Sequence, residues 1–144
     1  MIRKNASCIL HGERFSPRLA EQLTGIEFVS KDEPGEIGGW GRYKGKRIDY
    51  GSARIKPPET AQSSKAYDER WMVELLEAHI DQFRACGATN IVMYLAVEWE
   101  AQCNFEFDAG FLARLAKLNI PLAISCYEIE KPNGASDEST VEKS

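Results

Sequence analysis

A cluster of cations and aromatic rings in the first half of the chain has the residue types needed to bind a phosphorylated ligand. Its members lie between residues 40 and 47 and are Trp40, Arg42, Tyr43, Lys44, Lys46 and Arg47. Lysine and arginine neutralise phosphate, and an exposed aromatic ring stacks on a nucleotide base. The alternative interpretation is a solvated turn whose cations keep a strand edge from pairing with another chain. The segment contains no established nucleic-acid motif, so both interpretations stay open.

A group of carboxylates surrounds a tryptophan in the second half of the chain. The group comprises Glu98, Trp99, Glu100, Glu106 and Asp108. Paired carboxylates can transfer protons or bind a hard cation, but an exposed turn lacks the burial that such chemistry usually exploits. An aromatic ring among charges is also typical of an interface hot spot, where the charges guide the encounter with a partner. The competing interpretation makes Trp99 the last core residue of its strand, on the same face as Leu95 and Val97.

The cysteines and histidines form no recognisable catalytic or metal-binding pattern. The four cysteines are scattered, at Cys8, Cys86, Cys103 and Cys126, and the chain has only two histidines. Without a Cys-x-x-Cys pair, a zinc site is not expected. Cys8 and His11 lie three residues apart, which on a strand places their side chains on opposite faces. We therefore assign no catalytic residue, no metal ligand and no cofactor from the sequence.

An alternation of strands and helices must position these groups. The first half predicts a strand at 6–10, a helix that begins at the Ser16-Pro17 cap and ends at Gly25, and a strand at 26–30. A glycine-rich hairpin with strands at 40–43 and 47–50 is expected next, followed by an extended run at 53–56. The second half predicts a linker at 59–64, a helix at 66–85, a hairpin over 90–107, a helix at 109–118 capped by Asp108, and a strand at 122–129.

The long helix and the second hairpin provide the strongest periodic patterns. Apolar side chains recur at three- and four-residue spacing along 66–85, whereas Glu69, Glu74, Glu77 and Asp81 are expected mainly on the solvent side. In the hairpin, alternate residues are apolar from Ile91 to Trp99 and again at Cys103, Phe105 and Phe107. Each hairpin strand is therefore expected to present one face to a core.

The expected fold is α+β, with one mixed, mostly antiparallel sheet and helices packed on one face. A single domain is expected over residues 1–130, followed by a polar, disordered tail at 131–144. Tyr94 and Tyr127 fall on the sheet face opposite the helices. That face is too apolar for a fully solvated surface, so it is a candidate contact in an oligomer.

Charge is distributed unevenly along the chain. Residues 1–66 hold twelve Lys and Arg against eight Asp and Glu, whereas residues 67–144 hold six against fourteen. The first half therefore offers a basic surface and the second an acidic one, either of which can guide a charged partner. No apolar run approaches the roughly 20 residues of a membrane span. The N-terminal residues lack a signal-peptide core, and a cytoplasmic location is expected.

Three segments of the second half carry a family resemblance. They read Trp-Met-Val-Glu-Leu-Leu-Glu from Trp71, Val-Met-Tyr-Leu-Ala-Val-Glu-Trp-Glu from Val92, and Phe-Asp-Ala-Gly-Phe-Leu-Ala-Arg-Leu-Ala-Lys-Leu-Asn-Ile-Pro-Leu-Ala-Ile from Phe107. Over residues 66–128 the chain resembles a small bacterial domain family of unknown function. Small domains of this type resemble the immunity proteins that neutralise bacterial toxins, which implies a protein-binding role. The matching positions are mainly core residues, and the resemblance assigns no catalytic residue.

Three hypotheses about function follow. The first is a bacterial protein-binding module, such as an immunity protein, that binds a basic protein partner through the acidic group. The second is a binder of RNA or of a phosphorylated ligand through the basic loop at 40–47. The third is an enzyme whose active site matches no known motif. No membrane partner is expected under any of them.

The strand pattern makes a prediction about stability. Changing Leu95 or Phe105 to alanine is expected to lower the free energy of unfolding by about 2–5 kcal/mol, because both side chains are expected in the core. Glu98→Ala is expected to cost little, since Glu98 lies on the opposite face. Denaturant titrations of the three variants test this, and equal small losses would mean that the strand faces were assigned the wrong way round.

Overall fold

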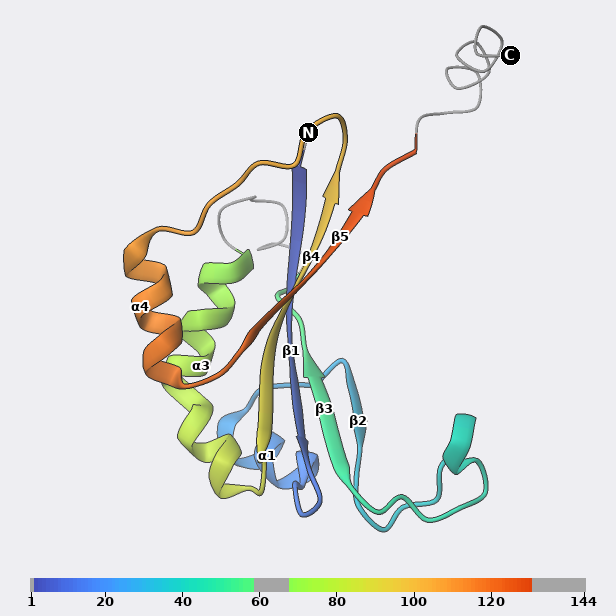
Figure 1. Ribbon diagram of the computed structural model, residues 1–144. Helices are drawn as coiled ribbons and strands as arrows, with labels where there is room; N and C mark the ends of the chain where they lie inside the picture. The colour runs from blue at the N-terminus through green and yellow to red at the C-terminus, as the bar shows by residue number, and fades with distance from the viewer. Residues whose placement is uncertain (1, 59–67, 131–144) are drawn as a thin grey trace, which may run out of the picture.

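A five-stranded mixed sheet is the framework of the computed structural model, which describes residues 2–58 and 68–130 (Figure 1). The strands are β1 (Ile2–Gly12), β2 (Ser30–Asp32), β3 (Gly51–Ile55), β4 (Asn90–Trp99) and β5 (Leu122–Glu128). Their order across the sheet is β2-β3-β1-β4-β5, and only the β4–β5 pair is parallel. The sequence-based prediction of an α+β fold with a mostly antiparallel sheet is confirmed.

Three α-helices and one short 3₁₀ helix complete the described elements. They are α1 (Pro17–Thr24), η1 (Gly41–Tyr43), α3 (Asp68–Ala85) and α4 (Ala109–Leu118). Figure 1 shows α1, α3 and α4 on one side of the sheet. The opposite side has no helix over it in the described part of the chain, and we call it the open face. The loop between β2 and β3 lies at one end of that open face.

The central strand β1 connects the two halves of the sheet. It pairs with β4 from Ile2 to His11, and its last five residues also pair with β3. The first four strands thus have the order and directions of a β-α-β-β-α-β sandwich, to which α4 and β5 add one parallel crossover. Alternate residues of β1 and β4 face the helices, where Ala6, Cys8, Leu10, Ile91, Met93, Leu95 and Val97 are buried.

The ends of two helices follow the rules that the sequence indicated. The Ser16 hydroxyl accepts a hydrogen bond from the Leu19 amide at 3.2 Å, Pro17 is the first helical residue, and Gly25 closes α1 in the left-handed conformation at a φ of 75°. The Asp108 carboxylate accepts from the Phe111 amide at 2.7 Å at the start of α4. Both caps satisfy amide groups that the helix itself leaves unpaired.

The hairpin predicted over residues 90–107 is wrong in its second half. The chain turns at Ala101, whose φ is 71°, and Cys103 to Phe107 then run without a strand partner. Both edges of β4 are already occupied, by β1 and by β5, so no position beside it is left for a hairpin strand. The predicted alternation survives, because Cys103, Phe105 and Phe107 pack against the core while the residues between them are exposed.

The glycine-rich hairpin is also wrong in detail. Instead of strands at 40–43 and 47–50, the structure has η1 followed by an irregular loop. The second strand begins only at Ser30 rather than at residue 26. Glu69, expected on the solvent side of α3, is 6% exposed. The linker predicted at 59–64 and the tail predicted at 131–144 lie outside the described residues.

Three backbone segments meet at the end of β1 with no room for side chains. Gly12 approaches the Gly87 carbonyl oxygen, and both Gly51 and Gly87 approach the turn at Arg14 and Phe15. A Cβ atom on Gly51 would collide with the Phe15 carbonyl oxygen. The junction is held by hydrogen bonds from the Ser16 amide to the Cys86 carbonyl at 3.0 Å and from the Thr89 amide to the His11 carbonyl at 2.9 Å. It fixes the end of β1 against β3 and α3.

An ion pair connects the two large helices. The Arg114 guanidinium on α4 donates to both carboxylate oxygens of Glu77 on α3, at 2.9 and 2.7 Å. This hydrogen-bonded guanidinium lowers the pKa of Glu77 below its ordinary value of 4.5. Both side chains are 39% exposed, so solvent weakens the interaction.

The junction predicts a strong and local effect of substitution. Gly51→Ala is expected to destabilise the fold by about 1–3 kcal/mol or more, because the added methyl group collides with backbone that cannot move alone. Gly39→Ala is the matched control, since no atom lies within 4 Å of its Cβ position and its φ is not positive. Thermal and denaturant unfolding would compare the two, and equal losses would contradict this account.

The Glu77–Arg114 pair predicts a pH-dependent contribution to stability. Because the pKa of Glu77 is lowered in the folded state, its contribution is present above the unfolded pKa and is lost as pH falls through the folded value. Glu77→Gln is therefore expected to cost about 0.2–1 kcal/mol at pH 7 and nothing in strong acid. Repeating the substitution in an Arg114→Ala background should abolish the difference at pH 7, and a cost that persists there would refute the pairing.

Candidate functional site

The segment between β2 and β3 carries the basic loop and is tied to the start of α1 by Glu33, whose carboxylate accepts hydrogen bonds from the Ser16 hydroxyl at 2.8 Å and the Arg18 amide at 3.0 Å. Its two arms are joined by backbone hydrogen bonds, with Gly35 and Glu36 facing Ile48 at 2.7 Å and Gly38 donating to Lys46 at 2.8 Å. Ile48 is 6% exposed and is the buried anchor of the loop. The arms therefore hold each other, and η1 is carried at their tip.

One glycine in the loop is required by a close approach. Gly38 lies against the Tyr43 carbonyl, and a Cβ atom there would collide with that oxygen. Its own carbonyl accepts from the Gly45 amide at 2.9 Å. Gly41 begins η1 with a φ of 68°, which an L side chain rarely adopts. These glycines fold the loop back so that Trp40, Arg42 and Tyr43 surround one hollow.

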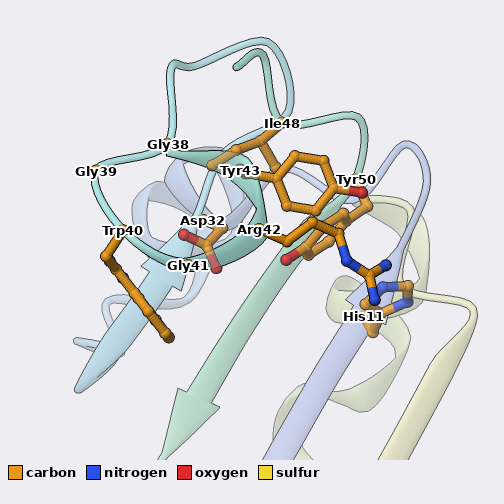
Figure 2. Close-up of a pocket in the computed structure, with 10 residues that line it drawn as sticks. All are labelled: His11, Asp32, Gly38, Gly39, Trp40, Gly41, Arg42, Tyr43, Ile48 and Tyr50. Carbon is orange, nitrogen blue, oxygen red and sulfur yellow. The ribbon is translucent and has the colours of Figure 1, made fainter. Parts of the chain in front are cut away.

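That hollow, the loop pocket, has a volume of about 430 Å³ (Figure 2). Its lining combines loop residues with residues from the ends of three strands: His11, Asp32, Gly38, Gly39, Trp40, Gly41, Arg42, Tyr43, Ile48 and Tyr50. A pocket of this size is in the range that holds a small ligand.

Sheet register supplies the floor of the loop pocket. His11 at the end of β1 and Asp32 at the end of β2 both pair with Ser52 of β3. Because residues opposite one another in neighbouring strands point to the same face, His11, Ser52 and Asp32 form one row on the open face. The Ser52 hydroxyl lies 3.3 Å from an Asp32 carboxylate oxygen, which it supplies with a hydrogen bond.

A chain of aromatic rings forms one wall. His11 stacks on Tyr50 with ring centroids 5.0 Å apart, and Tyr50 meets Tyr43 edge to face at 5.5 Å. The Tyr43 hydroxyl donates to Asp49 at 3.0 Å, and this hydrogen bond raises the pKa of Tyr43. The rings are thus held in place before any ligand arrives.

The rest of the wall combines an exposed ring with one cation and one carboxylate. Trp40 is 82% exposed, and Figure 2 shows Asp32 between it and Arg42, whose side chain extends towards His11. In the described part of the chain, no carboxylate forms an ion pair with the four loop cations Arg42, Lys44, Lys46 and Arg47. A cation without such an ion pair, in the same pocket as an exposed ring, can bind an anionic ligand that also carries a planar group.

Three of the six loop residues singled out from the sequence line the pocket. All six predicted loop residues lie on one excursion, but only Trp40, Arg42 and Tyr43 line the pocket. His11, Asp32 and Tyr50 were missed as members, because only the register of β1, β2 and β3 brings these three together. The sequence offered one indication of their role, because His11 and Asp32 lie at the ends of strands, where functional side chains often occur.

The predicted acidic group does not form one surface. Glu98 lies on the open face, with its carboxylate 3.5 Å from Arg3, whereas the half-buried Trp99 points to the other face of β4. Glu106 and Asp108 lie on the helix side of the sheet, where both line a hollow with Lys4. Glu100 follows β4 and takes part in an isolated bridge with Gln102.

Cys8 cannot serve as a nucleophile for His11. It faces the helices and is fully buried, and burial raises the pKa of its thiol to about 12. His11 lies on the opposite face and stacks on Tyr50. Among residues 2–58 and 68–130, no group of three or more histidine, cysteine or acidic side chains is placed to hold a metal ion. No helix in those ranges combines the length and apolar character needed to cross a membrane.

Comparisons of the chain with protein-family models, with curated proteins and with solved structures found no match. The loop pocket therefore has to be interpreted from its own geometry, and the family resemblance over residues 66–128 stays a prediction.

Proposed function

We propose that this protein binds a nucleotide unit, either free or within single-stranded RNA, in the loop pocket. The observation that carries the proposal is the exposed Trp40 ring at the rim of a pocket that also holds the Arg42 guanidinium, which forms no ion pair in the described part of the chain. A nucleotide has the matching chemistry, a planar base joined to a phosphate. Stacking on an aromatic side chain contributes roughly 1–3 kcal/mol per base, and arginine binds phosphate through two parallel hydrogen bonds.

The charges within the pocket give the ligand an orientation. Asp32 repels a phosphate and accepts hydrogen bonds from amino or hydroxyl groups. The phosphate is therefore expected on the side of Arg42, with the base or ribose edge towards Asp32 and the base against Trp40. The remaining loop cations, Lys44, Lys46 and Arg47, lie outside the pocket lining, and their charge would attract neighbouring phosphates of a longer ligand.

The open face supports a ligand longer than one nucleotide. A second hollow of about 310 Å³ lies on it, lined by Asn5, Ala6, Ser7, Arg54, Lys56 and Ala96. It lies along the same strands as the loop pocket, because Ile9 pairs with Arg54 two residues along β1 from the pair of His11 and Ser52. Its two cations are suited to phosphates of a strand that continues from the loop pocket.

The toxin-neutralising, enzymatic and oligomeric hypotheses stay predictions. A toxin-neutralising role would use the acidic residues, and these are divided between two faces of the sheet rather than gathered around Trp99. An enzyme with an unrecognised site would need a group that activates a substrate, whereas the geometry of the loop pocket supplies groups for stacking, phosphate binding and hydrogen bonding. An oligomer through the face of Tyr94 and Tyr127 would cover the strand path proposed here.

Binding is tested by fluorescence anisotropy with a labelled RNA of ten nucleotides and by competition with free mononucleotides at low salt. Trp40→Ala is expected to weaken binding about tenfold or more, since it removes the stacking ring. Arg42→Ser should weaken binding and lower the slope of log affinity against log salt by about 0.7, the value for one phosphate contact on a single strand. Lys117→Ser, an exposed cation on α4, is the control that should change neither.

The fold should survive these substitutions, because Trp40 and Arg42 are exposed. The competition arm separates the two forms of the ligand: a mononucleotide that displaces RNA at comparable concentration indicates a single-nucleotide site. Absence of binding to both ligands by the unmodified chain would end the proposal, as would a Trp40→Ala variant that binds like the unmodified chain.

A further inference from the structure

A further hollow, on the helix side of the sheet, contains a buried carboxylate with an unused oxygen. We call this hollow the ammonium pocket. It has a volume of about 180 Å³ and is lined by Lys4, Glu69, Arg70, Glu106, Phe107, Asp108 and Phe111. Glu69, near the start of α3, is 6% exposed. Its Oε1 atom accepts from the Lys4 ammonium at 2.7 Å, whereas Oε2 is buried without a hydrogen-bond partner among residues 2–58 and 68–130. A buried charged acceptor of this kind is normally satisfied, so the oxygen requires a donor.

The charged side chains around Glu69 favour a positively charged donor. Lys4 is already engaged, since its ammonium bonds Glu69 and lies 5.5 Å from the centre of the Phe107 ring. Arg70 makes only a long contact of 3.9 Å with Asp108. Three carboxylates, of Glu69, Glu106 and Asp108, therefore face two cations, and the hollow carries an excess of negative charge. A cationic donor satisfies both Oε2 and this excess, whereas a neutral hydroxyl satisfies only the oxygen.

The rings define the shape of the ligand. Phe107 and Phe111 stack with centroids 5.3 Å apart, and Phe111 is buried. Their apolar surfaces suit an alkyl stem, and aromatic faces also attract ammonium groups. A compact ammonium with three N–H groups on a thin stem fits such a small hollow better than a broad, planar guanidinium.

We propose that the ammonium pocket binds a primary alkylammonium group, with Glu69 Oε2 as the buried acceptor and Glu106 and Asp108 at the rim. Two sources present this chemistry, a lysine side chain of a protein partner and a free small amine. The site is distinct from the loop pocket, and it assigns Glu106 and Asp108 a role in recognising a cation without Glu98 or Trp99.

The test uses the full chain labelled with ¹⁵N, and follows the amide signals of Phe107, Asp108 and Phe111 by NMR. One arm adds an acetylated and amidated trilysine peptide, and the other adds 1,5-diaminopentane. Saturable shifts in either arm support the proposal and identify the source. The same peptide with its side-chain amines acetylated should produce no such shifts, because it lacks the charge and two of the N–H groups.

Matched substitutions locate the acceptor. Glu69→Gln keeps an oxygen for Lys4 but replaces Oε2 with a donor, and it is expected to weaken binding about tenfold or more. Glu74→Gln makes the same change at an exposed position of α3 and should leave affinity within about twofold. Asp108→Asn keeps a good helix cap while removing a rim charge, so it remains informative if Glu69→Gln impairs folding.

Three results would overturn the proposal. One is the absence of saturable shifts with either amine at millimolar concentration, which would mean that solvent alone satisfies Oε2. Another is equal binding of the acetylated peptide. The last is unchanged affinity in both Glu69→Gln and Asp108→Asn.

Discussion

The close approach of backbone at Gly12, Gly51 and Gly87 is the constraint on which the described fold depends. Here the end of β1, the start of β3 and the segment after α3 meet around the turn at Phe15, and only glycine leaves the carbonyl oxygens room. Because the junction fixes the end of β1, it also sets the position of His11 beside Ser52 and Tyr50. The glycine junction therefore positions the floor of the loop pocket, although no side chain of the pocket takes part in the junction.

Elements governed by local rules could be predicted from the sequence. The cap of α1 at Ser16, its end at Gly25 and the Asp108 cap of α4 depend on residues within a few positions, and all three are confirmed. The buried face of β4 was predicted for the same reason, since alternation is a local property and Leu95 is fully buried.

Features set by distant parts of the chain could not be predicted. Cys103, Phe105 and Phe107 have the pattern of a strand, but β1 and β5 already occupy both edges of β4. Half-buried Phe105 thus packs as part of an unpaired segment, which places its truncation at the low end of the range expected for core residues. Glu69 is buried because Lys4, 65 positions earlier, supplies its partner. The row of His11, Ser52 and Asp32 likewise exists only once two strand registers are set.

The loop pocket and the ammonium pocket differ in how far they are tied to the core. The ammonium pocket is built from β1, α3 and the segment before α4, so altering it alters the packing of Phe111 and Lys4. The tip of the loop between β2 and β3 is held by backbone hydrogen bonds between its own arms and by one buried side chain, Ile48, whereas Glu33 at its base bonds Ser16 and Arg18 at the start of α1. Its charges and rings can therefore change in the course of evolution at little cost to folding. The same scaffold can acquire a new ligand through substitutions at this tip, and natural variation in specificity should concentrate there.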